Sequence, residues 1–492
     1  MGEFCYSIRM STGWKLEHTY TQLPDAFFSN VPPVPVAAPS LIALNHPLAV
    51  TLGLDPELLS TDATQILSGN PLPVGTKTLA QAYAGHQFGH FTMLGDGRAL
   101  LLGEQIDPHG RRWDIQLKGS GQTPYSRRGD GRAAVGPMLR EYLISEAMFA
   151  LGIPTTRSLA VLATGEPVFR ETTLPGAVLI RVAASHVRVG TFEYAATLGP
   201  EYVRKLADYV IQRHYPELTD SEGRYENLLR EVIRRQAHLI ADWMNVGFVH
   251  GVMNTDNMAI SGETIDYGPC AFMDRYDPET VFSSIDRHGR YAYGRQPSIA
   301  LWNLTRFAET LIPLFDSSEA AAVATAETCL ADFPIAFSEQ WQEGMRNKLG
   351  LFESVPEDES LIADLLTLMH ENRLDFTNTF RLIALADTRD HLESDPTLQI
   401  LKNWNARLAR RRRLEERPIE ETRTLMRHAS PNLIPRNHHV EDALAAAERG
   451  DLSSFQELFT ALQHPFEDRR EHRLYLEPRP VDSEPYRTFC GT

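Results

Sequence analysis

The sequence predicts an α+β protein in which a strand-rich part precedes a mainly helical part. Apolar runs rich in β-branched residues and separated by turn residues fill residues 81–180, as is typical of strands. Apolar residues at helical spacing then dominate residues 181–465. No internal repeat or low-complexity tract is evident.

The expected elements follow one another along the chain. Residues 1–80 contain the proline-rich stretches "NVPPVPVAAPS" and "SGNPLPVGT", which favour an extended wrap around a core. "ALLLGEQI" and "RRWDIQLKG", joined by the turn "DPHG", form a predicted hairpin. "PMLREYLISEAMFALG" has helical spacing and ends at Gly152, and "RSLAVLAT" and "GAVLIRVA" are two further strands.

The helical part begins with a strongly amphipathic segment. "YENLLREVIRRQAHLIADWMNVG" places apolar residues such as Leu228, Ile233 and Trp243 on one face and ends at Gly247. The basic run Arg407–Arg423 is interleaved with glutamates, which favours a solvated helix over an anion-binding site.

Composition excludes several classes of function. The net charge of −16 argues against general nucleic-acid binding, which needs a basic surface. No run of 18 uncharged apolar residues appears, so no membrane span is expected. The first residues lack the apolar block of a signal peptide, and Cys5, Cys270, Cys329 and Cys490 form no metal-ligand pair. A cytoplasmic protein fits these features best.

The stretch "HGVMNTDNMAISGETIDYG" (His250–Gly268) carries the strongest chemical signal. Kinase-like enzymes have His-x-Asp, an Asn five residues after that Asp, and a hairpin that ends in Asp-Phe/Tyr-Gly. His250, Asn257 and Asp266 match this spacing, but Val252 stands where the catalytic Asp belongs and cannot accept a proton. The site is therefore either a dead kinase or one that performs different chemistry on ATP.

The oxygen-bearing side chains of this stretch suit a hard metal ion. Asn257 and Asp266 would meet at the ends of the hairpin "MAI–SGE–TID" and could bind Mg²⁺ or Mn²⁺. Taken singly, each is as readily explained as a turn residue. Asp256 is the one nearby carboxylate that could replace the missing base, and it could equally be a turn-capping residue.

Upstream glycines and a lysine could form a phosphate site. Gly95 and Gly97, beside Arg98, let the backbone approach a phosphate, although Asp-Gly also marks ordinary hairpins. Lys118 ends a strand, as the phosphate-binding lysine of kinases does, and needs a helical carboxylate to hold it. Glu141 and Glu146 are the candidates.

Two strand-end arginines and a second glycine-rich loop complete the candidates. Arg181 and Arg188 could bind triphosphate oxygens in a bidentate manner or form ordinary salt bridges. "RRGDGRAAVGP" leads into a helix N-terminus, which suits anions. Its Asp130 would repel phosphate, so this Asp130–Gly131 turn is assigned to the base or ribose of a nucleotide.

The motifs "LGDGR", "QLKGSGQTPYSRRGDGRAAVGPMLREYLISEAM", "SHVRVGTFEY" and "HGVMNTDNMAISGETIDYGP" closely resemble the selenoprotein O family, called YdiU in bacteria. The resemblance covers most of the chain. It implies a protein-kinase-like bilobal fold, with an N-terminal extension at 1–80, a β-rich N-lobe at 81–180, a helical C-lobe at 181–465 and a tail at 466–492. It also implies a protein adenylyltransferase that moves AMP from ATP to Ser, Thr or Tyr hydroxyls of proteins, with ATP inverted relative to kinases.

The resemblance assigns a role to each candidate residue. Asp256 would be the proton acceptor, Asn257 and Asp266 the metal ligands, and Glu141 the carboxylate that holds Lys118. The remaining nucleotide-binding residues would be Gly95, Gly97, Arg98, Lys118, Asp130, Gly131, Arg181 and Arg188. With ATP inverted, Asp130 would accept adenine N6–H, and the arginines would hold the departing pyrophosphate.

Two alternatives and one redox question stay open. A phosphotransferase similar to aminoglycoside kinases is disfavoured by Val252, and a non-catalytic, ATP-binding pseudokinase is disfavoured by the presence of both metal-ligand candidates. Cys490 occupies the family's C-terminal selenocysteine or cysteine position. Phe282 stands where some members carry the partner cysteine, which leaves a regulatory disulfide open, with Cys270 as the candidate substitute partner.

Overall fold

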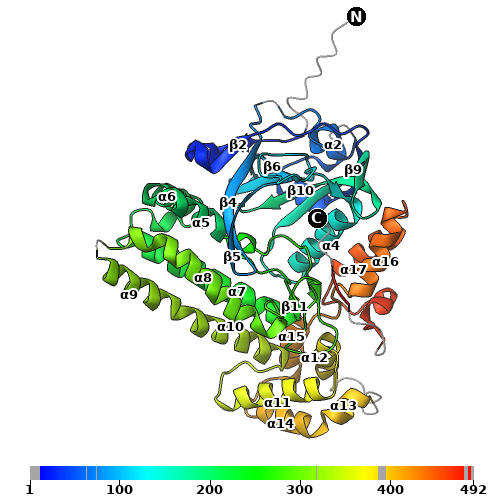
Figure 1. Cartoon of the computed structure of the whole chain (residues 1–492). Coiled ribbons are helices and arrows are strands. Elements are labelled where there is room, and N and C mark those ends of the chain that lie inside the picture. Colours follow the sequence, from blue (N-terminus) through cyan, green and yellow to red (C-terminus); the bar gives the residue numbers. More distant parts are fainter. Residues whose placement is uncertain are drawn as a thin grey trace, which may run out of the picture.

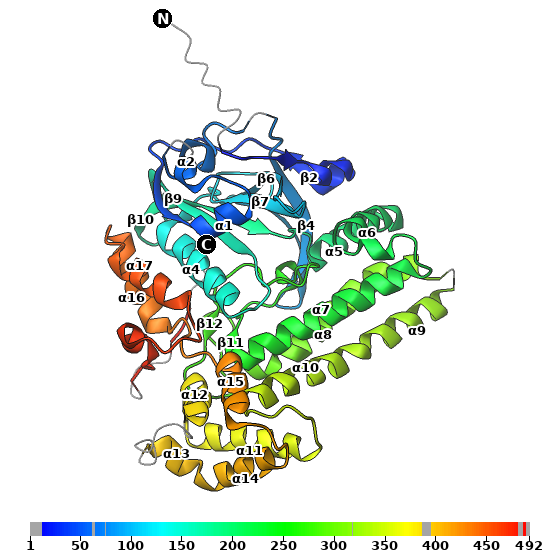
Figure 2. The same ribbon diagram turned by 180° about the vertical axis from the view of Figure 1, so that it is seen from behind.

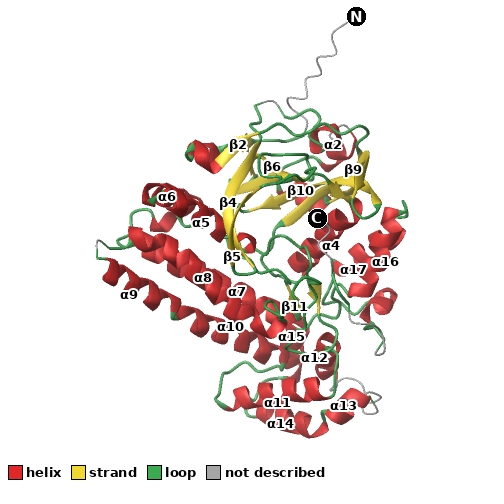
Figure 3. Ribbon diagram, viewed as in Figure 1, coloured by secondary structure: helices red, strands yellow, loops and turns green. Residues whose placement is uncertain are grey.

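The computed structural model describes residues 12–61, 64–73, 75–316, 318–385, 395–480 and 486–488. One large antiparallel sheet lies beside an extensive group of helices (Figures 1 and 3). The strands come mainly from the first part of the chain and the long helices from the second. The predicted α+β class is confirmed.

The large sheet joins strands from the first two hundred residues. Its main order is β2-β4-β6-β7-β10-β9-β3, with β1 paired to β6, β5 to β4 and β8 to β10. Every pairing is antiparallel. The strands are β1 (Leu16–Glu17), β2 (Phe28–Asn30), β3 (Ser40–Leu44), β4 (Leu79–Gln87), β5 (His90–Gly95), β6 (Ala99–Ile106), β7 (Arg112–Lys118), β8 (Ala133–Ala134), β9 (Arg157–Phe169) and β10 (Thr173–Ala183); a separate pair consists of β11 (Phe248–Val249) and β12 (Ala271–Phe272).

The register of two central strands positions part of the site. Gln116 on β7 lies opposite Arg181 on β10, and Lys118 lies opposite Leu179. Side chains two residues apart on a strand share a face, and so do directly opposed residues of antiparallel neighbours. Gln116, Lys118 and Arg181 therefore project from one face of the sheet. The predicted hairpin of β6 and β7 is confirmed by their pairing.

The helices pack on both faces of the sheet and extend away from it. They are α1 (His46–Thr51), α2 (Pro56–Thr61), α3 (Thr64–Leu67), α4 (Val135–Ala150), α5 (Val189–Leu198), α6 (Pro200–His214), α7 (Arg224–Val246), α8 (Gln296–Leu311), α9 (Glu319–Leu330), α10 (Asp332–Lys348), α11 (Glu357–Glu371), α12 (Phe376–Leu385), α13 (Pro396–Ile400), α14 (Lys402–Arg413), α15 (Ile419–Ala429), α16 (Asn437–Glu448) and α17 (Ser453–Leu462). α4 packs on β9 and β10, and α16 and α17 pack against α4 (Figure 2). α7 ends at Gly247, whose φ of 73° gives the left-handed C-cap expected from the sequence.

The N-terminal stretch is more structured than the expected extended wrap. β2 pairs with β4 and β3 pairs with β9, so two of its segments are strands of the main sheet. The short helices α1 to α3 pack their apolar residues, including Leu48 and Leu67, with those of β6, β7, β9 and β10 in one buried cluster. Proline-rich composition had hidden these short elements, which are stabilised by contacts with distant strands.

By length and composition, the helical segment Glu319–Lys348 is apolar enough to cross a membrane. It contains charged residues, so it is not an uncharged apolar run. Within this segment, α10 packs along α7 and α9 packs against α7 and α8. A single segment of this kind is weak evidence for a membrane span, because helices of soluble proteins pass the same test.

Candidate functional site

A cavity of about 630 Å³ lies between the large sheet, α4, the loop that follows β7, and the His250–Gly268 stretch. Polar and charged side chains from segments far apart in sequence reach it. All of the site residues expected from the sequence line this cavity: Gly95, Gly97, Arg98, Lys118, Asp130, Gly131, Glu141, Arg181, Arg188, Asp256, Asn257 and Asp266. Val252 lines it too.

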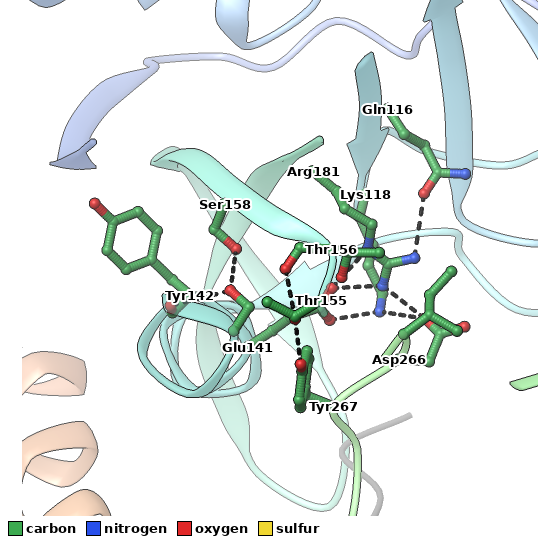
Figure 4. Close-up of polar contacts among 12 residues, drawn as sticks. Gln116, Lys118, Glu141, Tyr142, Thr155, Thr156, Ser158, Arg181, Asp266 and Tyr267 are labelled. Carbon is green, nitrogen blue, oxygen red and sulfur yellow. Dashed lines mark hydrogen bonds and ion pairs between the residues drawn. The ribbon is translucent and has the colours of Figure 1, made fainter. Parts of the chain in front are cut away.

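A buried charge cluster forms the wall next to the sheet (Figure 4). Lys118 Nζ donates to Glu141 Oε2 at 2.6 Å and to Asp266 Oδ1 at 3.0 Å. Arg181 bridges the same two carboxylates, with Nη2 at 2.5 Å from Glu141 Oε1 and 2.6 Å from Asp266 Oδ1. Arg188 Nη1 donates to Asp266 Oδ2 at 2.5 Å. Three cations thus surround two carboxylates.

The ionisation of this cluster follows from burial and the neighbouring charges. Burial alone would raise the pKa of Asp266, but Arg181, Arg188 and Lys118 outweigh it and hold that pKa well below its usual range. Burial likewise opposes ionisation of Glu141, and Arg181 and Lys118 nevertheless lower its pKa. Both carboxylates therefore stay ionised, and the cluster keeps one excess positive charge. Such a wall favours an anionic ligand such as a phosphate.

The choice between Glu141 and Glu146 is decided by the helix on which both lie. Five residues correspond to a rotation of about 140° around an α-helix, so the two side chains point to different sides. Glu141 faces Lys118, whereas Glu146 binds Arg157 at 2.6 Å and the backbone N–H of Ser158 at 3.0 Å. Glu146 is not part of the cavity wall.

His250 connects the two ends of the motif. Its Nε2 lies 2.9 Å from the carbonyl oxygen of Ile265, the residue before Asp266, and its ring stacks on Trp243 of α7. Its backbone N–H donates to Gln296 Oε1 at 3.0 Å. These contacts hold the start of the motif and Asp266 together.

The expected hairpin of residues 258–266 is wrong. Ala259 bridges Arg188, and Thr264 bridges Thr155, so the two arms pair with other segments instead of each other. The turn between them is closed by Gly262 N–H donating to Ala259 O at 3.1 Å. The hairpin was expected from the kinase-like motif, which did not identify the partners of its two arms. Asn257 and Asp266 still line the same cavity.

Asp256 is buried, and the pKa of its carboxyl group lies above that of an ordinary aspartate. Burial, opposed by the charge of Arg188, raises its pKa to about 6. Its Oδ1 has no hydrogen-bond partner within the part of the chain that the structure describes. The residue lies in a short 3₁₀ turn, Thr255–Asn257, whose N-cap is Asn254. A carboxyl group that lines a cavity and has a pKa of about 6 suits proton transfer better than turn capping.

The side chains of Asn257 and Asp266 offer oxygen atoms to the cavity, and oxygen atoms are the ligands that a hard divalent cation prefers. Asn257 Nδ2 donates to Val252 O at 2.9 Å, and this bond orients the amide so that Oδ1 remains available as a ligand. Mg²⁺ is usually bound by one or two protein oxygens together with water and substrate phosphates. Within the described ranges, no group of three or more His, Cys, Asp or Glu side chains could hold a metal. A divalent ion held by these two side chains would take its remaining ligands from water and from the phosphates of a nucleotide.

The glycines at the other end of the cavity have a packing role. A β-carbon on Gly95 would overlap the ring of Tyr125, and one on Gly97 would lie 2.9 Å from Tyr125 O. Gly131 has a φ of +67° and approaches Gly121 closely. These contacts bring the loop after β7 against the β5–β6 turn. The glycines thus shape the cavity wall, whichever ligand occupies it.

Asp130 has a partner that the sequence did not indicate. Arg170 donates to both carboxylate oxygens of Asp130, at 2.8 and 3.0 Å, and the pair stands partly exposed at the cavity rim. Arg170 lies in the turn between β9 and β10, where an arginine is unremarkable by sequence. The far wall was missed as well: Glu441, Leu444 and Glu448 of α16 line the cavity from the last part of the chain. No local signal links that helix to the nucleotide motifs.

Only one of the two cysteines proposed for a disulfide lies within the described residues. Cys270 is buried and free, and burial raises the pKa of its thiol to about 11. Cys490 falls outside the described residues. The disulfide stays a prediction.

Comparison with known proteins identifies the relatives of this architecture. A family model described as "Protein adenylyltransferase SelO" matches residues 12–463. The chain is 56% identical over 485 residues to the "Protein nucleotidyltransferase YdiU" of Bacillus cereus (strain AH187), covering 98% of this chain and 99% of that protein. The protein of that name from Bacillus anthracis (strain A0248) shows the same identity and coverage. The match therefore extends over all the segments that build the cavity.

Proposed function

This chain belongs to the SelO family of protein adenylyltransferases and is a nucleotidyltransferase, and we propose that it transfers AMP from ATP to Ser, Thr or Tyr hydroxyls of proteins. The cavity supports this proposal in three respects. A positively charged wall favours phosphates, two oxygen ligands suit Mg²⁺ or Mn²⁺, and Asp256 offers an unpartnered carboxylate oxygen.

The observation that carries the proposal is the pair Val252 and Asp256. Val252 occupies the position of the kinase base and is buried on the cavity wall, where it cannot accept a proton. Asp256, four residues later, is the carboxylate of this loop that lines the cavity. The proton acceptor is therefore displaced along the loop relative to a kinase. A displaced base suits a nucleotide that presents its α-phosphate in place of the γ-phosphate.

We propose a kinase-like arrangement in which the sheet and α4 form the smaller lobe and the helices that follow β10 form the larger one. The boundaries at residues 80, 180 and 465 belong to this proposal. ATP would lie inverted, with Lys118, Arg181 and Arg188 holding the β- and γ-phosphates. Adenine would lie toward Asp130 and Gly131, with Asp130 oriented by Arg170.

The side chains of the cavity can accept the proton and the leaving group of the proposed AMP transfer. The acceptor oxygen attacks the α-phosphorus, and a new O–P bond forms while the bond from that phosphorus to the α–β bridging oxygen breaks. The hydroxyl proton passes to Asp256, and pyrophosphate leaves along the cationic wall. A divalent ion held by Asn257 and Asp266 would supply further positive charge to the phosphate oxygens.

ATP labelled at either the α- or the γ-phosphate tests the proposal. We expect label on protein from α-labelled ATP alone, for the wild type and for Val252→Asp. Label from γ-labelled ATP would identify a phosphotransferase instead. Nucleotide binding without label from either form would identify a non-catalytic ATP-binding protein.

A further inference from the structure

A patch of aromatic and cationic side chains lies beside the catalytic loop and has no role in nucleotide binding. It consists of His86, Phe91, Met93, Arg290, Trp302 and Arg306, and we call it the Trp302 patch. None of the six lines the nucleotide cavity. The patch joins the β4–β5 hairpin to α8 and to the turn that precedes it.

Ring contacts make the patch continuous. The His86 ring lies 5.4 Å from that of Phe91 and 5.3 Å from that of Trp302, both edge to face. The guanidinium groups of Arg290 and Arg306 lie 4.9 and 5.1 Å from the centroid of the Trp302 ring. Phe91 and Met93, two residues apart on β5, share one face of that strand and are 46% and 51% exposed. Large apolar side chains are thus in contact with solvent.

The charge of Arg290 is uncompensated. Arg306 is paired with Glu309 at 2.6 Å. For Arg290, the described part of the chain provides ring contacts with Tyr291 and Trp302 and no ion pair. The chain as a whole carries a net charge of −16. A half-buried guanidinium without an ion pair, beside exposed aromatic and apolar side chains, is complementary to an acidic partner.

The patch is bonded directly to the loop that carries Asp256. The backbone N–H of His86 donates to Thr255 Oγ1 at 2.7 Å. Tyr291, next to Arg290, donates its hydroxyl to Asn254 Oδ1 at 2.6 Å, and Phe88 N–H donates to the same oxygen at 3.1 Å. The patch is thus joined through β4 to this loop, and the side chain of Asp256 lies on the other face of β4, against Gly85.

β5 adds a backbone element to this surface. Among the described strands it pairs with β4 alone, so its other edge is open. An extended peptide can add to such an edge through main-chain hydrogen bonds, while neighbouring pockets select its side chains. Trp, Arg, Phe and Met are also the residues most enriched in the energetically important centres of protein interfaces.

We propose that the Trp302 patch and the open edge of β5 bind an extended, acidic segment of the acceptor protein, which continues around the β4–β5 hairpin toward Asp256. The proposal rests on the proposed AMP transfer and names the partner surface of that site. Arg290 selects negative charge near the acceptor residue. Phe91, Met93 and Trp302 provide the apolar contact area.

Synthetic peptides test this proposal. Two extended peptides share one acceptor hydroxyl and differ in flanking residues, glutamates in one and lysines in the other. With α-labelled ATP we expect kcat/KM for the acidic peptide to exceed that for the basic one by at least ~10-fold. Arg290→Glu should reverse this preference, and Phe91→Ala should lower kcat/KM for both peptides. Arg306→Ala, which removes a charge that is already paired, is the matched control and should change the preference little.

Two control measurements distinguish a failure of the docking proposal from a failure of the proposed AMP transfer. ATP affinity and hydrolysis of ATP to AMP without peptide should be unchanged in all three variants. The docking proposal would be overturned if the wild type used both peptides equally, or if Arg290→Glu kept the preference of the wild type. It would also be overturned if the wild type hydrolysed ATP to AMP without labelling either peptide. A change from oligomer to monomer in the variants would assign the patch to contacts between copies. Label from γ-labelled ATP would instead overturn the proposed function.

Discussion

Gly85 on β4 lies directly against the side chain of Asp256. A β-carbon at Gly85 would come within 2.9 Å of both Cβ and Cγ of Asp256, and closer still to Oδ1. Gly190 at the start of α5 approaches from another side, where a β-carbon would lie 3.3 Å from Asp256 Cα. The proposed base is thus confined between a strand and a helix N-terminus. This confinement fixes its position by packing, and it also accounts for its raised pKa.

Gly85→Ala should impair transfer by displacing Asp256. The added methyl group cannot be accommodated without moving the carboxylate, and such misplacement costs up to about 100-fold in rate. ATP affinity should change little, because the cationic wall is untouched. The measurement is kcat with α-labelled ATP for Gly85→Ala, Asp256→Ala and the double variant. If the two losses are simply additive, Gly85 acts independently of Asp256 and this explanation is wrong.

Asp256→Ala should lose the contribution of a general base. That contribution is about 10²–10⁴-fold in turnover, with the dissociation constant for ATP nearly preserved. Asp256→Asn keeps the shape of the side chain and should lose a similar amount. Turnover close to that of the wild type in the Asn variant would show that Asp256 only supports the loop.

Lys118→Ala should weaken ATP binding or turnover by at least ~10-fold, which corresponds to about 1.4 kcal/mol of binding or activation free energy. Glu141→Gln should act in the same direction but less strongly, because Lys118 and Arg181 lose one shared carboxylate and keep Asp266. Glu146→Gln is the matched control on the same helix. It breaks the pair with Arg157 and should affect stability without changing KM for ATP. Unchanged kinetics in both Lys118→Ala and Glu141→Gln would contradict a phosphate site at this wall.

Asp266→Asn should abolish metal-dependent transfer and also destabilise the protein. The substitution leaves Lys118, Arg181 and Arg188 with a single buried carboxylate, and loss of one partner of a buried ion pair costs about 3–5 kcal/mol. A polyanion should offset this loss, so pyrophosphate should raise the melting temperature of the variant more than that of the wild type. Asp277→Asn, at an exposed position, is the control. Normal transfer by Asp266→Asn in the presence of a chelator would rule out the metal assignment.

Lys348 gives the protein a pH-dependent stability that is unrelated to the site. Burial lowers the pKa of this lysine to about 7, and its Nζ donates to Ala429 O at 2.8 Å. Between pH 7 and the ordinary lysine pKa of about 10.4, the unfolded chain binds more protons than the folded one, so this group makes stability rise with pH. Lys348→Met should lack that slope, which is at most about 1.4 kcal/mol per pH unit.

The melting temperatures of Lys348→Met and wild type, followed from pH 7 to 9, provide the measurement. The variant should be stabilised relative to wild type most strongly at pH 7, and the difference should shrink as pH rises. The lost bond to Ala429 adds an offset that does not depend on pH. Lys205→Met, on the exposed side of α6, should show no such trend. A difference that is independent of pH would mean that Lys348 stays protonated in the folded protein, with a pKa that burial does not lower.

Local sequence was sufficient for the elements that depend on near neighbours. The β6–β7 hairpin, α4 and α7 were predicted from periodicity and from the turn or glycine that ends them, because those signals act over a few residues. The same locality explains the failures. The segment 258–266 was expected to form a hairpin, yet its two arms pair with Arg188 and Thr155, which are distant in sequence.

Some features of the candidate site were likewise predictable from the sequence, and others became known only from the tertiary structure. The motif spacing by itself predicted that Asn257 and Asp266 belong to one site and that Val252 stands at the position of the kinase base, since these relations lie within one short segment. Only the tertiary structure decided that Glu141 and not Glu146 meets Lys118, that Arg170 binds Asp130, and that α16 closes the cavity. Those contacts join strands and helices up to several hundred residues apart. Their partners are selected by sheet register and by the packing of whole helices, and no local pattern encodes them.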